Sequence, residues 1–178
     1  MSRLINRIKR FYFIKCRKMD ESDITIMQMR KKGICIGENC RLFTCITAKE
    51  PTLITIGNRV TVSSDVEFCT HDNGIIKAIP GKTDVVGPIE IGDDCFIGMH
   101  SIIMLGVVLG DHCIVGAGSV VTKSFPPRCV IAGNPARIIC TIDEYAEKYR
   151  QFAIDFREIP MHARAEYFEA HPELMVRR

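Results

Sequence analysis

The chain has 178 residues, a formal net charge of +3 and 47% hydrophobic residues. Its length suits one domain with short appendages, and so small a charge lacks the strongly basic profile of a nucleic-acid binder. No apolar run approaches the roughly 20 residues of a membrane-spanning helix, and the N-terminus lacks the apolar core of a signal peptide. We therefore expect a cytoplasmic protein with no nucleic-acid partner.

Residues 1–33 are expected to form an N-terminal helical capping segment. Residues 1–18 carry seven Lys or Arg and no acidic residue, and apolar positions 4, 5, 8, 11 and 12 share one helical face. Such a helix suits two roles: peripheral contact with an anionic membrane, or cover for the open end of a repeat domain. Because every solenoid needs a covered end, we favour the second. Residues 19–33 are interpreted as a polar connector.

Residues 34–140 follow a six-residue repeat. It is clearest from Ile91 to Val121, where every block opens with an aliphatic residue that is usually followed by glycine. Six is neither a helical nor a hairpin period, but it is typical of a parallel β-helix, in which three blocks form one coil. The leading aliphatic residues then point inward, and the blocks add up to about four to five coils. These leading residues are Ile91, Ile97, Ile103, Leu109, Val115 and Val121.

Two interruptions break the repeat. A slip of two residues at 49–51 predicts an outward bulge at a corner, after which the frame resumes at Ile56. The segment 74–84 is a longer insertion, and Val85 re-enters the repeat in phase with Ile91. The insertion is therefore a loop protruding from a continuous solenoid, and such loops commonly build a binding face.

The cysteines do not indicate a metal site. Cys40, Cys95 and Cys113 each occupy the fifth position of a block, where a small buried side chain fits. Because no pair has the spacing of zinc ligands, we expect reduced structural thiols and no bound metal.

Residues 141–178 are expected to form a helical extension. Thr141 precedes Glu144 by three residues, which predicts a capping box, and Pro160 ends the first helix before a second piece at 161–171. The aromatic residues of the first helix are expected to pack on the open end of the solenoid. They are Tyr145, Tyr149, Phe152 and Phe156.

Three blocks carry a family resemblance: IGDDCFIG, GVVLGDHCIVGAGSVVTKSFPP and AGNPARII. They resemble the hexapeptide-repeat acyltransferases, most closely the sugar and polysaccharide O-acetyltransferases of the maltose and galactoside acetyltransferase group. The resemblance covers about residues 34–140. It implies a left-handed parallel β-helix, a homotrimer with active sites between subunits, and transfer of an acetyl group from acetyl-CoA to a hydroxyl of a sugar or polysaccharide precursor.

A transfer from a thioester to a hydroxyl needs a base, and histidine suits that role near neutral pH. His71 stands where the repeat stops and the insertion begins. In the resembled family the catalytic histidine borders this loop, which implies that His71 is the general base; the alternative is a turn histidine. His100 and His112 fall in mid-block positions and are expected at the surface. Asp72, Asp65 and Glu67 are the candidate carboxylate partners of His71.

The substrate-binding candidates are Asp72, Asn73 and Phe96. Asp72 and Asn73 could bind sugar hydroxyls or simply form a turn, and both roles stay open. By resemblance, Phe96 walls the acceptor or acyl pocket. Where the family often has a contributing serine, this chain has Met99, which leaves the oxyanion donor unassigned.

The cofactor-binding candidates lie near the end of the repeat. The resemblance implies that the Ala117 backbone contacts pantetheine and that Thr122, Lys123 and Arg137 lie at the nucleotide end of coenzyme A. Lysine and arginine are suitable phosphate partners.

Other functions remain open from the sequence. The chain could act on a small non-sugar acceptor such as an antibiotic or serine, or be a non-catalytic trimeric scaffold. It could also be a metal-dependent protein of the carbonic anhydrase type. That function would require His71, His100 and His112 to converge.

Overall fold

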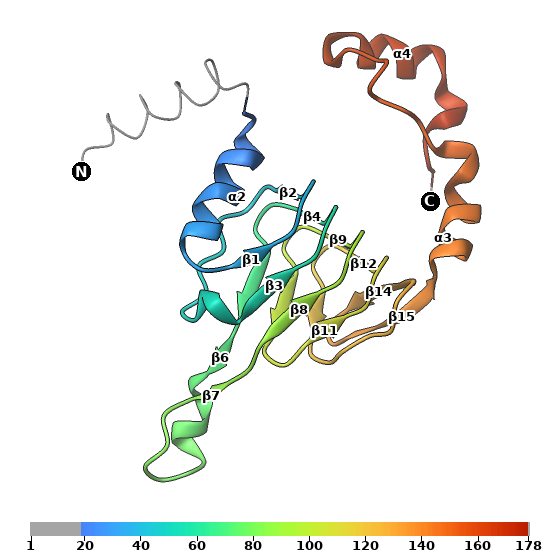
Figure 1. Cartoon of the computed structure of the whole chain (residues 1–178). Coiled ribbons are helices and arrows are strands. Elements are labelled where there is room, and N and C mark those ends of the chain that lie inside the picture. The colour runs from blue at the N-terminus through green and yellow to red at the C-terminus, as the bar shows by residue number, and fades with distance from the viewer. Residues whose placement is uncertain (1–18, 178) are drawn as a thin grey trace.

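The computed structural model describes residues 19–177, and Figure 1 shows a parallel β-helix with a protruding arm and helices beyond both ends. Its three sides are parallel sheets, and successive strands along the chain pass from side to side. The first side contains β1 (Cys35–Ile36), β3 (Ile54–Ile56), β8 (Ile89–Ile91) and β11 (Val108–Leu109). The second contains β2 (Arg41–Leu42), β4 (Thr61–Val62), β9 (Phe96–Ile97), β12 (Ile114–Val115), β14 (Cys129–Gly133) and the antiparallel β15 (Ala136–Thr141). The third contains β5 (Glu67–Cys69), β10 (Ile102–Met104) and β13 (Val120–Val121).

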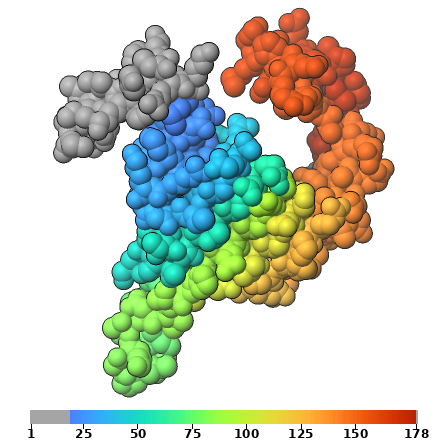
Figure 2. Space-filling view, viewed as in Figure 1, coloured from blue at the N-terminus to red at the C-terminus, as the bar shows by residue number. Residues whose placement is uncertain are grey.

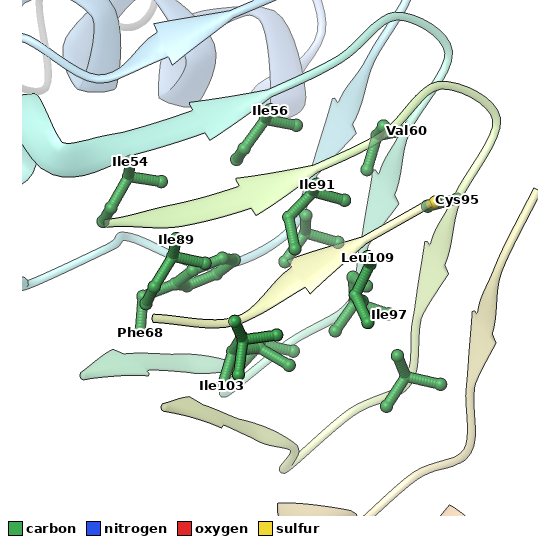
Figure 3. Close-up of a cluster of buried hydrophobic side chains, with 14 of the residues drawn as sticks. Ile54, Ile56, Val60, Phe68, Ile89, Ile91, Cys95, Ile97, Ile103 and Leu109 are labelled. Carbon is green, nitrogen blue, oxygen red and sulfur yellow. The ribbon is translucent and has the colours of Figure 1, made fainter. Parts of the chain in front are cut away.

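The leading aliphatic residues stack in columns inside the β-helix, as the repeat predicts. On the first side Ile56 lies opposite Ile91, and Ile91 lies opposite Leu109. On the second side Val62, Ile97 and Val115 form the equivalent column, and all three are fully buried. Figure 3 shows Ile56, Ile91, Leu109 and Ile97 pointing into the interior of the β-helix. The first side has four strands and Phe125 forms a further bridge to Leu109, so the expected four to five coils are present.

Polar side chains join the coils at the edge between the first and second sides, hereafter the first edge. Asn58 Oδ1 accepts the Glu38 N–H, Asp93 Oδ1 accepts the Asn58 N–H, and Asp111 Oδ1 accepts the Asp93 N–H. Each bond satisfies an amide that the turn leaves unpaired, so this ladder holds successive coils in register. The second edge joins the second and third sides, and the third edge joins the third side to the first.

The segment expected to be a polar connector is instead helix α2 (Glu21–Lys31). Its N-terminus has a capping box, in which the carboxylates of Asp20 and Asp23 each accept the backbone N–H of the other. Ser22 Oγ accepts the Leu42 N–H at 2.7 Å, which binds α2 to the first coil. The buried apolar residues of α2 are Ile24, Ile26 and Met29. This helix therefore covers the end of the solenoid.

The predicted amphipathic helix at 1–18 lies outside the described residues, so its capping and membrane roles stay predictions. Within residues 19–177, helices are too short or too polar to cross a membrane.

The protruding arm is longer than the predicted loop. β6 (His71–Asp72) pairs antiparallel with β7 (Val85–Val86), and a 3-10 helix at Asn73–Lys77 lies between them. Val85 does not re-enter the repeat as expected: it is 43% exposed in the arm, and the next coil begins at β8. Figures 1 and 2 show the arm extending well away from the β-helix. A second, shorter excursion is the 3-10 helix at Pro51–Leu53.

The C-terminal extension begins as predicted but packs differently. Thr141 and Glu144 form the expected capping box of α3 (Ile142–Tyr149). A 3-10 helix at 150–152 follows, and a 3-10 helix at 161–163, α4 (Arg164–Ala170) and a 3-10 helix at 172–174 complete the extension. No residue of these helices is buried. The aromatic residues mostly pack on one another rather than on the solenoid end; Phe156, for example, contacts Phe168 with ring centroids 5.9 Å apart.

The cysteines predicted to be structural are buried. Cys40, Cys95 and Cys113 lie along the first edge with at most 7% exposure, and Cys129 continues the column. Burial raises the pKa of the Cys40 thiol, which favours its neutral form.

Candidate active site

His71 lies at the third edge, on the first residue of the arm. Its Nδ1 atom is buried and has no hydrogen-bond partner among residues 19–177, although the side chain as a whole is 30% exposed. Oε2 of Glu50 lies 3.2 Å from Nδ1, within ion-pair distance but outside hydrogen-bond alignment. The exposed part of the ring therefore points away from Glu50, and the buried nitrogen faces its carboxylate.

Glu50 is held in this position by the neighbouring coil. The hydroxyl of Thr70, a fully buried residue, donates a hydrogen bond of 2.8 Å to Glu50 Oε2. One carboxylate oxygen thus contacts both the threonine and the imidazole. A carboxylate in this place stabilises the ring when it gains a proton and fixes its orientation.

None of the three predicted carboxylate partners occupies this place. Asp65 lies at the second edge, 3.9 Å from His100, and Glu67 points outward from β5. Asp72 accepts the Gly74 N–H at 2.7 Å and so forms a turn.

The spacing of the repeat could have identified Glu50. Ile36 lies opposite Ile56, twenty residues later, so one coil at this level spans twenty residues. Residue 50 is therefore one coil before residue 70. Both interruptions fall at the same phase of the coil, and adjacent coils bring them together.

Asp72 and Asn73 make the contacts of turn residues. Asn73 Nδ2 donates to the Thr83 carbonyl at 2.7 Å and to Asp84 Oδ1 at 3.3 Å, across the base of the arm. The pKa of Asp84 is lowered, first by the Thr83 hydroxyl and then by Asn73. An acceptor-binding role for Asp72 and Asn73 stays a prediction.

A groove of about 460 Å³ runs along the outer face of the second side, next to the second edge. Its floor consists of small residues in register. Ser63 donates its N–H to the Ile97 carbonyl on the next coil, and Gly98 and Gly116 each donate in the same way to a carbonyl one coil further on. A Cβ atom on Gly98 would lie only 2.5 Å from the Ala117 nitrogen, so larger residues do not fit there. The walls are Phe43, Phe96, Met99, Ala117, Val130 and Tyr145.

The predicted site residues fall into two groups within one chain. Phe96 and Ala117 lie together in the groove, and Arg137 lies nearby on β15, opposite Ala132. Thr122 and Lys123 follow β13, at the third edge where His71 lies two coils earlier. The two groups therefore occupy different edges, and one chain does not bring the histidine to the groove.

The three histidines of the metal hypothesis do not converge within one chain. His112 lies at the first edge, 3.7 Å from Asp94, whereas His100 and His71 lie at the second and third edges. Among residues 19–177, no group of three or more His, Cys, Asp or Glu is arranged to hold a metal ion.

Comparison with known proteins identifies the family. Residues 88–123 match the model described as the hexapeptide repeat of succinyl-transferase. Over 142 residues the chain is 43% identical to Protein CapG of Staphylococcus aureus, which covers 76% of this chain and 80% of CapG. The chain belongs to the hexapeptide-repeat acetyltransferase family.

Two further members of this hexapeptide-repeat family are informative. The galactoside O-acetyltransferase of Escherichia coli K12 is 33% identical over 118 residues, 66% of this chain and 58% of that enzyme. A solved hexapeptide-repeat acetyltransferase from Vibrio cholerae matches with a TM-score of 0.54 and 28% identity, over 62% of this chain and 64% of that one. That Vibrio protein has also been solved with acetyl coenzyme A. The β-helix is the left-handed form expected from the resemblance.

Proposed function

We propose that this acetyltransferase moves an acetyl group from acetyl-CoA to a hydroxyl of a sugar or surface-polysaccharide precursor, with His71 as general base. The observation that carries this proposal is the contact of the buried His71 Nδ1 with Glu50, which is itself fixed by Thr70. The galactoside enzyme among the relatives supports a sugar acceptor.

In the proposed reaction, the exposed nitrogen of His71 takes the proton of the acceptor hydroxyl as its oxygen attacks the thioester carbonyl. The new C–O bond forms and the C–S bond breaks. The leaving thiolate then takes the proton back from the imidazolium. Glu50 stabilises that imidazolium between the two proton transfers because its carboxylate faces the other ring nitrogen.

The groove on the second side suits the donor. A floor without bulky side chains lets an extended pantetheine arm lie close to the backbone, beside Ala117. Arg137, an exposed residue of β15, lies opposite Ala132 near the C-terminal end of this groove, and its guanidinium donates to the Ala136 carbonyl at 2.8 Å. Its remaining donors suit a phosphate of the bound donor. Acetyl-CoA in the Vibrio relative supports the same donor here.

The separation of the two groups supports a homotrimer with active sites between subunits. His71, Thr122 and Lys123 of one copy would then face the groove of the next copy. The arm also carries exposed apolar side chains, including Ile76, Ile79 and Val86, which a neighbouring subunit would cover.

The test is release of coenzyme A from acetyl-CoA with a panel of nucleotide sugars, lipid-linked glycans and galactosides. Product is separated by chromatography, since exposed cysteines such as Cys35 and Cys45 would react with a thiol reagent. His71→Ala is expected to lower kcat by about 10²- to 10⁴-fold while the mass of the oligomer in solution is unchanged. Unchanged turnover in that variant would remove His71 from the mechanism. A wild-type chain that releases no thiol with any acceptor would favour the scaffold alternative.

A further inference from the structure

An apolar side chain, Phe43, lines the groove at the first coil. Phe43 donates its N–H to Val62 at 2.9 Å, and Ser63 donates its N–H to Ile97 at 3.0 Å. These bonds place Phe43, Ser63 and Gly98 in line on three successive coils. Beyond the small side chains of the floor, the line therefore meets an aromatic ring.

The Phe43 ring is held in place although 48% of the residue is exposed. The Arg41 guanidinium lies 5.2 Å from its ring centroid, a cation–π arrangement on the same strand and turn. Phe96 and Met99, which flank the adjoining part of the groove, are 43% and 46% exposed. Three large apolar side chains thus face the solvent around a space that the small Ser63 leaves open.

Large apolar side chains line the N-terminal end of the groove, and an arginine lies beside each end: Arg41 stacks on Phe43, and Arg137 lies on β15 opposite Ala132. An acyl-CoA has phosphates at one end and an acyl chain at the other, and the apolar lining suits the acyl end. The direction in which it would lie rests on the donor-binding role in the proposed function.

We propose that Phe43 limits the length of the acyl chain, and that the groove accepts propionyl and butyryl groups as well as acetyl. With the acyl carbonyl level with Gly98, Phe43 lies two coil spacings, or about 9.6 Å, further along the groove. Van der Waals contact with the ring takes up about 3.7 Å of that distance, which leaves room for about five carbon–carbon bonds. A four-carbon acyl chain therefore fits, whereas a six-carbon chain meets the Phe43 ring. The transfer step is unchanged: the ester C–O bond forms, the thioester C–S bond breaks, and the hydroxyl proton passes through His71 to the thiolate.

The experiment measures calorimetric affinities of acetyl-, butyryl- and hexanoyl-CoA for the full chain, which needs no acceptor. The wild-type chain is expected to bind butyryl-CoA at least as tightly as acetyl-CoA and hexanoyl-CoA about tenfold more weakly than butyryl-CoA. Phe43→Ala is expected to tighten hexanoyl-CoA binding by about tenfold or more, and Phe43→Trp to weaken butyryl-CoA binding by a similar factor.

Phe156→Ala is the matched control. Phe156 is 40% exposed and also lies under an arginine, Arg164, with 4.4 Å between guanidinium and ring centroid, but it belongs to the C-terminal extension. This variant is expected to keep the wild-type preference. Circular dichroism would show that each variant is folded, and the mass of the oligomer in solution would show that it is assembled.

Two results would overturn this inference and leave the proposed function standing. One is an unchanged chain-length preference in Phe43→Ala while acetyl-CoA still binds. The other is a lower mass of the oligomer in solution for that variant, which would show that a second copy, not an acyl chain, covers Phe43. Failure of every acyl-CoA to bind would instead overturn the proposed donor, and this inference with it.

Discussion

Replacing Glu50 by Gln tests how the site activates His71. The amide keeps the size of the side chain and can still accept the Thr70 hydroxyl, so the change removes mainly the negative charge beside Nδ1. Two unit charges 3.2 Å apart attract by about 5 kcal/mol at an effective dielectric constant of about 20. Both side chains are about 30% exposed, and solvent screening reduces this to about 1.5–3 kcal/mol.

We therefore expect Glu50→Gln to lower kcat by about 10- to 150-fold, because each 1.36 kcal/mol corresponds to a factor of ten. The KM for acetyl-CoA should change little, since Glu50 contacts His71 and Thr70 and does not line the groove. Steady-state release of coenzyme A measures both constants. In the double variant with His71→Ala, Glu50→Gln should cause almost no further loss, because it acts through the imidazole.

Asp65→Asn is the control, since Asp65 is the carboxylate beside His100 at another edge and should leave kcat unchanged. If Glu50→Gln kept kcat within about twofold of wild type, or if its effect added fully to that of His71→Ala, the carboxylate would not support the base.

Three further predictions concern the scaffold and the donor. Ile97→Ala should lower the free energy of unfolding by about 2–5 kcal/mol in denaturant titrations, because it leaves a cavity in a fully buried column; Ile138→Ala, at an exposed site, should change it by less than about 0.5 kcal/mol. Hydrogen bonding from Asn58 lowers the pKa of Asp93, so its stabilising effect is present above the unfolded pKa and is lost as the pH falls through the lower folded value. Stability should therefore decrease below about pH 4, and less so in Asp93→Ala; an identical acid limb in both proteins would argue against this role. Arg137→Ala should raise the KM for acetyl-CoA at least about fivefold with kcat nearly unchanged, and an unchanged KM would place the phosphates elsewhere.

The β-helix could be predicted because its repeat is local and its phase is visible in the sequence. A leading aliphatic residue every six positions determines which side chains face the axis, and the observed registers follow it from Ile36 to Val121. The capping box at Thr141 was equally local. Helix α2 was missed because its sequence is polar overall, and only its contact with the first coil shows which residues are buried.

The site could be predicted only in part because it depends on contacts between coils. His71 was predicted from its place beside the insertion, whereas Glu50, twenty-one residues earlier, lies in the segment interpreted as a separate bulge. The groove combines residues from five coils with Tyr145 of α3, a set that no local pattern groups together. Val85 fits the six-residue phase, but pairing with His71–Asp72 places it in the arm.

The stacking of the coils also fixes the positions along the axis at which a side group can lie. Neighbouring coils are one strand spacing apart, so a group placed at a corner can be moved along the axis only by whole coil spacings. The two chain excursions, at Glu50 and at His71, begin on adjacent coils at the third edge. Moving either excursion to another coil would separate the pair by a full step, while lengthening the arm within its own coil leaves the pair intact. The arm can therefore vary in length and sequence without disturbing the position of the base.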